Sequence, residues 1–120
     1  RPMRYMLLIY DRESEWPKMS EADQQAMMGE YFAFTDSIQK SGNYIAGDAL
    51  QPVATATTLR VREGKALTTD GPFAETREQL GGYYLVKAEN LDQALAIAAR
   101  IPSARSGSIE IRPVMEFDGP

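Results

Sequence analysis

The stretch TDGPFAETREQLGG, residues 69–82, holds the side chains of this sequence that are best suited to acid–base chemistry. An aspartate in a turn commonly accepts the backbone N–H two residues on, but after Asp70 that residue is Pro72, which has none. A turn stiffened by Pro72, with Phe73 packed into the core, would hold the carboxylate in one place. In a closed apolar cavity such a carboxylate exchanges protons near neutral pH, so we predict Asp70 as a candidate catalytic acid or base.

A second interpretation of this turn involves no catalysis. The Asp70 carboxylate would accept backbone N–H groups of residues 73 and 74 and organise a loop between two strands. Asp-Gly-Pro is first of all a turn-forming sequence, so the residue pattern favours this structural role over the catalytic one.

Five further side chains are suited to holding a substrate. Arg77 can clamp a carboxylate with two parallel hydrogen bonds, and Asp48 offers a second carboxylate near a strand end. Tyr10 and Tyr84 lie on apolar segments, where their hydroxyl groups can contact a ligand. The candidate substrate-binding residues are therefore Tyr10, Asp48, Phe73, Arg77 and Tyr84. The alternatives are a solvated ion network around Arg77 and ordinary core packing of the tyrosines.

The residue types that are absent exclude several classes of site. The chain has no histidine and no cysteine, so it has no thiol nucleophile, no histidine base and no histidine or thiolate metal ligand. No glycine pattern of a Rossmann or P-loop site is present, and no acidic spacing matches a calcium loop. We expect neither a metal nor a cofactor.

Charge and length bound the partners and the domain count. The net charge is −4 and no cluster of basic residues occurs, which argues against nucleic acid as a ligand. No apolar run is long enough to span a membrane and no signal-peptide pattern is visible, so we expect a cytoplasmic protein without a membrane partner. The 120 residues suffice for one domain, which we assign to residues 3–117, with residues 1–2 as an extension.

Hydropathy patterns predict alternating strands and helices. The expected elements are a central strand over 3–10, a helix over about 20–40, a strand over 44–50, a hairpin over 57–69, a strand over 81–88, a helix from Asn90 that stops before Pro102, and an edge strand over 108–117. Ser20 and Asn90 are the expected helix caps, and Glu63-Gly64 the hairpin turn. We expect the hairpin to have one face in water.

The apolar residues of the two helices predict which side chains are buried. The first helix has a stripe at Met27, Tyr31, Phe34 and Ile38. The neighbouring group Met27, Met28, Tyr31 and Phe32 is interpreted as core. In the second helix the expected buried stripe is Leu91, Ala94, Leu95 and Ala98.

The element order predicts an α+β fold of the ferredoxin-like, split βαβ kind, with both helices on one face of the sheet. The strands 3–10 and 82–88 are apolar on both faces, although two helices can cover only one face. A second copy of the same sheet is the simplest cover for the other face. We therefore predict a homodimer with sheet packed on sheet and a ligand cavity between them.

Several segments resemble one protein family. The segments MRYMLLIY, ALQPVATATTLRVREG, TDGPFAETREQLGGYYLV and IEIRPV are similar, in this order, to YCII-related proteins of the DGPF type, and the resemblance runs from Met3 to about Val114. It implies a dimeric α+β barrel. In simpler relatives a proposed site pairs a histidine on the first helix with a later aspartate; Asp70 is in the position of the aspartate, but this chain has no histidine.

The resemblance and the residues together give two functional hypotheses. One is a protein that binds a small organic molecule in a cleft at the dimeric sheet face, with isomerase- or lyase-type proton transfer by Asp70 that needs no cofactor. The other is a non-catalytic accessory or sensor protein linked to an extracytoplasmic-function sigma factor, because many relatives are encoded beside such factors. The accessory role predicts an exposed apolar or acidic patch around Trp16 and little interior room, whereas a non-catalytic binder or sensor would use the same cavity as the enzyme.

Overall fold

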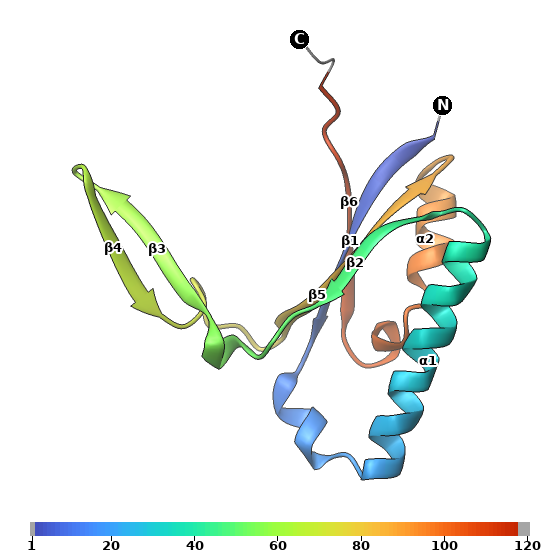
Figure 1. Ribbon diagram of the computed structural model, residues 1–120, viewed down its shortest axis with the longest axis horizontal. Helices are drawn as coiled ribbons and strands as arrows, with labels where there is room; N and C mark the ends of the chain where they lie inside the picture. Colours follow the sequence, from blue (N-terminus) through green and yellow to red (C-terminus); the bar gives the residue numbers. More distant parts are fainter. Residues whose placement is uncertain (1, 118–120) are drawn as a thin grey trace.

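The fold is a four-stranded antiparallel sheet with two helices on one face and a separate β-hairpin, as a computed structural model covering residues 2–117 shows (Figure 1). The sheet order is β2-β5-β1-β6. Its strands are β1 (Met3–Asp11), β2 (Tyr44–Ala49), β5 (Gln79–Ala88) and β6 (Ser108–Pro113). β1 and β5 are central, as their apolar sequences predicted, and β6 with its Pro113 forms an edge.

The connections give the sheet a ferredoxin-like topology. Each βαβ unit is split by one intervening strand, since β5 lies between β1 and β2 and β1 lies between β5 and β6. The helices are α1 (Glu21–Lys40) and α2 (Leu91–Ala98), and the short 3₁₀ turns are η1 (Glu13–Lys18), η2 (Val53–Thr55) and η3 (Pro102–Arg105). The predicted α+β class and ferredoxin-like sheet are confirmed.

Both helices begin at the predicted caps. The Ser20 hydroxyl accepts the backbone N–H of Asp23 at 3.1 Å, and the Asn90 amide oxygen accepts that of Gln93 at 2.9 Å. These bonds satisfy N–H groups that the first turn of a helix leaves without a partner. The starts of both helices are therefore determined locally.

The core lies between the sheet and the two helices. Tyr5, Leu7 and Ile9 alternate along β1 as buried residues, and Phe34 and Ile38 of α1 pack against them. In α2 the buried residues are Ala94, Ile97 and Ala98.

The predicted buried stripe of α2 was wrong for two residues. Leu91 and Leu95 are about half exposed. The helix is only eight residues long, and its small Ala94 and Ala98 lie against the sheet. Leu91 and Leu95 consequently lie beside the contact between α2 and the sheet, where the sheet does not cover them.

The hairpin consists of β3 (Thr57–Arg62) and β4 (Lys65–Asp70), which pair only with each other. Glu63 and Gly64 have φ of 51° and 76°, so the turn is of the left-handed kind that suits the twist of paired strands. Figure 1 shows this hairpin on the side of the sheet away from α1 and α2. The prediction of one face in water was wrong for the single chain, because neither face is covered and almost every residue is exposed.

No helix of residues 2–117 packs on the second face of the main sheet, the face opposite α1 and α2 (Figure 1). Met6, Leu8 and Leu85 alternate with the buried residues of β1 and β5 and are partly exposed. The two-sided apolar character read from the sequence is thus present in the structure. No helix of the described residues is long and apolar enough to cross a membrane.

Candidate functional site

A large cleft lies on the helix side of the sheet, where η1, the first half of α1, the end of β2 and the start of β5 meet. Its volume is about 1440 Å³ and apolar side chains form most of its surface. Trp16 and Pro17 of η1 line one side, and Leu50 and Val53 after β2 line another. The chain thus forms a large open binding space without a second copy.

α1 supplies the apolar wall of this cleft. Met27, Met28, Tyr31 and Phe32 all line it, and Phe32 is 68% exposed. The interpretation of this group as core was wrong for Met28 and Phe32, which are exposed, whereas Tyr31 packs against the core. Phe34 and Ile38 meet the sheet, whereas Met28 and Phe32 lie to one side of that row and point into the open space.

Two hydroxyl pairs lie deeper in the cleft. The hydroxyl groups of Tyr31 and Ser103 are 2.5 Å apart, and those of Thr35 and Tyr84 are 2.6 Å apart. Burial raises the pKa of Tyr31 and of Tyr84 above the ordinary tyrosine value, against the opposing effect of these hydrogen bonds. Both phenols therefore remain neutral hydrogen-bonding groups over the whole physiological pH range.

The raised pKa values predict that the fold loses stability in strong alkali. A tyrosine whose pKa is higher in the folded state holds its proton there after the unfolded chain has lost it, so the unfolded state gains stability as pH rises above about 10. We expect the free energy of unfolding to be constant with respect to Tyr31 and Tyr84 below that value and to fall above it. Urea unfolding between pH 8 and 11 tests this, and Tyr31→Phe with Tyr84→Phe should reduce the slope. An unchanged slope in that double variant would contradict the assignment.

Gly47 of β2 permits the position of Tyr84. A Cβ atom at residue 47 would lie 2.6 Å from the Tyr84 ring and 3.1 Å from the backbone oxygen of Tyr83. The ring also makes edge contacts with Phe34 and Tyr44, at centroid distances of 5.2 and 6.4 Å. The bare backbone at Gly47 thus leaves room for an aromatic floor in the cleft.

The acidic side chains that line the cleft are all engaged within the chain. Asp11 accepts the Ser106 hydroxyl at 2.8 Å, and Glu13 accepts the backbone N–H of Val53 at 3.0 Å. The remaining two are held by a cation and a phenol. Glu15 lies 3.7 Å from the Lys18 ammonium group, and Asp48 accepts the Tyr83 hydroxyl at 2.8 Å.

The two basic residues of the lining differ from these acids. Neither the Arg12 nor the Arg77 guanidinium makes an ion pair or a hydrogen bond within residues 2–117. They are consequently the charged groups of the cleft that remain available to a ligand.

The structure brings three of the predicted substrate-binding residues to this cleft. Asp48, Arg77 and Tyr84 line it. Tyr10 does not; it follows the buried Ile9 on β1 and belongs to the opposite face of the sheet. Phe73 lies outside the cleft lining as well.

Asp70 ends β4 and is exposed, outside the cleft lining. Its carboxylate accepts no hydrogen bond within residues 2–117, from residues 73 and 74 or from elsewhere. The turn is held instead through its backbone, with the Gly71 N–H donating to the Ala56 oxygen at 2.7 Å and the Thr58 hydroxyl donating to the Gly71 oxygen at 2.8 Å.

Phe73 departs from its expected environment. The prediction that it packs into the core was wrong for the single chain, because 80% of its surface is exposed. Phe73 lies in the connection between β4 and β5, and it belongs neither to the hydrophobic core nor to the partly buried residues packed against it.

Sequence reasoning missed several residues of the cleft. Arg12, Trp16 and Thr35 line the cleft but were not among the predicted site residues, and Phe32 was assigned to the core. One signal was present, since Met28 and Phe32 form a second apolar row beside the stripe of α1 and widen its apolar face. A helix that needs only one row for packing against a sheet has the second row free for another contact.

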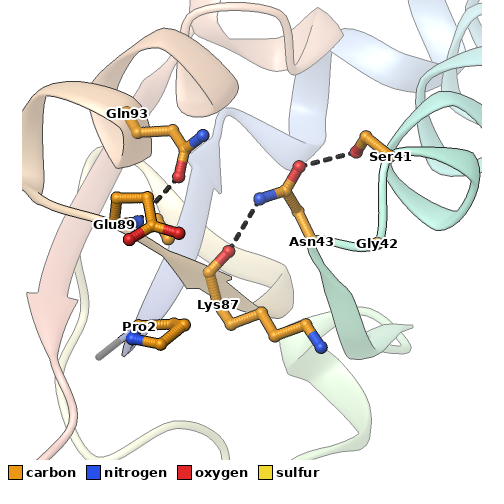
Figure 2. A pocket seen from close by; sticks show the side chains of 8 residues that line it. Pro2, Ser41, Gly42, Asn43, Lys87, Glu89 and Gln93 are labelled. Carbon is orange, nitrogen blue, oxygen red and sulfur yellow. Dashed lines mark hydrogen bonds between the residues drawn. The ribbon is translucent and has the colours of Figure 1, made fainter.

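A smaller depression of about 480 Å³ lies at the opposite end of the sheet, where α1 ends (Figure 2). Asn43 bridges its walls, accepting the Ser41 hydroxyl at 2.6 Å and donating to the Lys87 backbone oxygen at 2.8 Å. The Gln93 side chain accepts the Glu89 N–H at 2.7 Å. Because these polar groups bind each other, the depression is better explained as a structural junction than as a ligand site.

Comparison with known proteins identifies relatives over nearly the whole chain. Residues 3–118 match the YCII-related domain. An uncharacterized protein of Rhizobium meliloti (strain 1021) is 36% identical over 114 residues, which cover 93% of this chain and 92% of that protein. The family resemblance read from the separate sequence segments is therefore confirmed, and the chain belongs to the YCII-related family.

Proposed function

We propose that the protein binds a small apolar molecule carrying an anionic group, such as an aliphatic or aromatic carboxylate, in the helix-side cleft. The observation that carries this proposal is the pairing pattern of the charged lining residues. Within residues 2–117 the acids have partners, whereas Arg12 and Arg77 have none. An anion would complete the pairing, and Arg77 has the planar fork that binds carboxylates.

The apolar walls of the cleft suit the apolar part of this ligand. Trp16, Met28 and Phe32 are exposed large apolar side chains on one concave surface. Clefts that hold small molecules are typically apolar with a few polar groups that fix orientation. The hydroxyl groups of Tyr31 and Tyr84 supply such groups in the interior.

The proposal is tested with Trp16, the single tryptophan of the chain, which lines the cleft and so reports on its occupancy. Octanoate and cyclohexanecarboxylate are titrated into the protein while tryptophan fluorescence is recorded, each beside its uncharged primary amide. We expect the carboxylates to change the emission saturably and the amides to bind at least about tenfold more weakly, since a hydrogen bond to a charged group contributes about 1.5–3 kcal/mol.

Two variants separate a specific site from general attraction to positive charge. Arg77→Gln is expected to weaken carboxylate binding about tenfold and to leave amide binding unchanged. Lys87→Gln removes the same charge from a residue outside the cleft and should change neither. Equal binding of acid and amide, or equal loss in both variants, would contradict the proposal.

The uncovered face of the sheet supports the predicted homodimer as part of the same proposal. Met6, Leu8 and Leu85 form the centre of that face, with Arg4 and Lys87 toward one end. Two such faces can pack about 10 Å apart and bury their apolar residues against each other. The helix-side clefts of both subunits would stay accessible in this arrangement.

The proton transfer proposed for Asp70 requires this dimer. The Asp70 carboxylate is exposed in the single chain, so it can serve as an acid or base in a closed site only where a second chain excludes solvent from it. The accessory-protein hypothesis predicts little interior room and an exposed apolar or acidic patch around Trp16. A cleft of about 1440 Å³ that includes Trp16 fits small-molecule binding better.

A further inference from the structure

The β3–β4 hairpin is an arm without support from its own chain. Its strands pair only with each other, and nearly all of its residues are exposed. An isolated two-stranded hairpin is marginally stable in water, because it has no layer beneath it to bury side chains. This hairpin is nevertheless regular over six residue pairs, from Thr57 opposite Asp70 to Arg62 opposite Lys65.

The arm carries apolar residues that a solvated hairpin would not need. Leu59 and Val61 lie on one face, exposed by 60% and 59%, and Leu67 on the other is exposed by 50%. Phe73, the most exposed of this group, follows at the base of the arm. Large exposed apolar side chains on both faces of the arm and at its base indicate a surface that is covered in the working assembly.

We propose that this arm, residues 57–73, embraces a second copy of the same chain. The inference rests on the homodimer proposed above and adds what the arm does in it. Figure 1 shows the arm on the side of the sheet that the helices leave uncovered, which is the side where a second sheet would pack. A chain docked on that face would lie beside the arm.

The length of the arm fits this role. Six residues of extended chain span about 20 Å, twice the spacing of about 10 Å between packed sheets. The arm therefore reaches past the sheet of the partner toward the helix layer behind it. The arm carries three basic residues, Arg60, Arg62 and Lys65. Their positive charges would be attracted to the partner chain, whose net charge is −4.

The same contact gives the Asp-Gly-Pro-Phe turn its environment. Backbone and hydroxyl hydrogen bonds from Gly71 to Ala56 and from Thr58 to Gly71 join this turn to the arm. Covering the arm would consequently cover Phe73 and bring groups of the second chain to the Asp70 carboxylate, which accepts no hydrogen bond within the described residues of its own chain. In the dimer, the Asp-Gly-Pro-Phe turn of each subunit is then covered by the other subunit.

Sedimentation equilibrium tests the arm with a paired control. The double variant Leu59→Ser/Val61→Ser should raise the dimer dissociation constant at least tenfold. Leu95→Ser removes an exposed leucine from α2, on the helix side, and should leave it unchanged. If both variants dimerise like the wild type, the arm does not embrace the partner although the dimer stands; if the wild type is a monomer at all concentrations, the dimer and the arm both fail.

Amide hydrogen exchange of the wild type gives a second measurement that needs no variant. We expect the amides of residues 57–70 to be protected at concentrations where the protein is dimeric and to lose most of that protection on dilution to monomer. Protection that is the same in both states would overturn the inference. Binding of carboxylates, followed through Trp16, remains a separate measurement, so its failure does not bear on the arm.

Discussion

Replacing Gly107 by alanine is expected to lower the free energy of unfolding by more than about 2 kcal/mol, the largest effect of a single added methyl group among the glycines of residues 2–117. The new Cβ would lie 2.0 Å from the backbone oxygen of Tyr10 and 3.0 Å from the Cα of Asp11. Backbone atoms of a central strand cannot turn aside as a side chain does. Relief therefore requires the segment before β6 to move away from β1.

This movement would also reach the cleft. Ser106, next to Gly107, donates its hydroxyl hydrogen bond to Asp11 at 2.8 Å, and both residues line the cleft. We expect Gly107→Ala to release this bond and to weaken carboxylate binding. Urea unfolding and the Trp16 titration measure the two effects, at equal protein concentration because a dimer gains stability with concentration.

Gly29 supplies the matched control. A Cβ at this position of α1 meets nothing within 4 Å, so Gly29→Ala should stabilise the protein by about 0.5–1 kcal/mol through its better helix propensity. A Gly107→Ala protein as stable as the wild type would contradict the close packing of the η3–β6 connection on β1.

Replacing Gly47 by alanine is expected to cost about 1–3 kcal/mol and to disturb the cleft directly. The clash at 2.6 Å is with the ring of Tyr84, and the backbone oxygen of Tyr83 lies 3.1 Å away. The ring would have to shift from Gly47 and thereby lengthen the hydrogen bond between Tyr84 and Thr35. Carboxylate binding should weaken along with stability.

A double-mutant cycle identifies Tyr84 as the cause. Gly47→Ala should cost much less in a Tyr84→Leu background, because the shorter side chain leaves room for the new methyl group. The unfolding free energies of the wild type, the two single variants and the double variant give the coupling. Strictly additive effects would show that the loss at Gly47 arises elsewhere, from the backbone of β2.

Local signals in the sequence predicted much of the fold. The caps at Ser20 and Asn90 and the turn at Glu63-Gly64 depend on residues a few positions apart, and the structure has all three where they were expected. The order of strands and helices follows from periodicities of two and 3.6 residues, which are also local. Together these restricted the chain to a ferredoxin-like sheet.

The site was predicted only in part, because it depends on which apolar surfaces meet. Met28 and Phe32 were assigned to the core since a sequence shows that a side chain is apolar but not what covers it. Phe73 was assigned to the core for the same reason, yet it is 80% exposed. Asp48, Arg77 and Tyr84 were chosen for their chemistry, which sequence does reveal, and they do meet at one cleft.

The sequence by itself determined the element types, the helix caps, the two-sided apolar strands and the absence of histidine and cysteine chemistry, since each is a property of neighbouring residues or of composition. Only the tertiary structure decided that the cleft lies between η1, α1 and the sheet, that Arg12 and Arg77 alone among its charged residues lack a partner within residues 2–117, and that the hairpin stands apart. These features depend on distances between segments far apart in the chain. Such distances are fixed by packing, in which many apolar side chains compete for the same few surfaces.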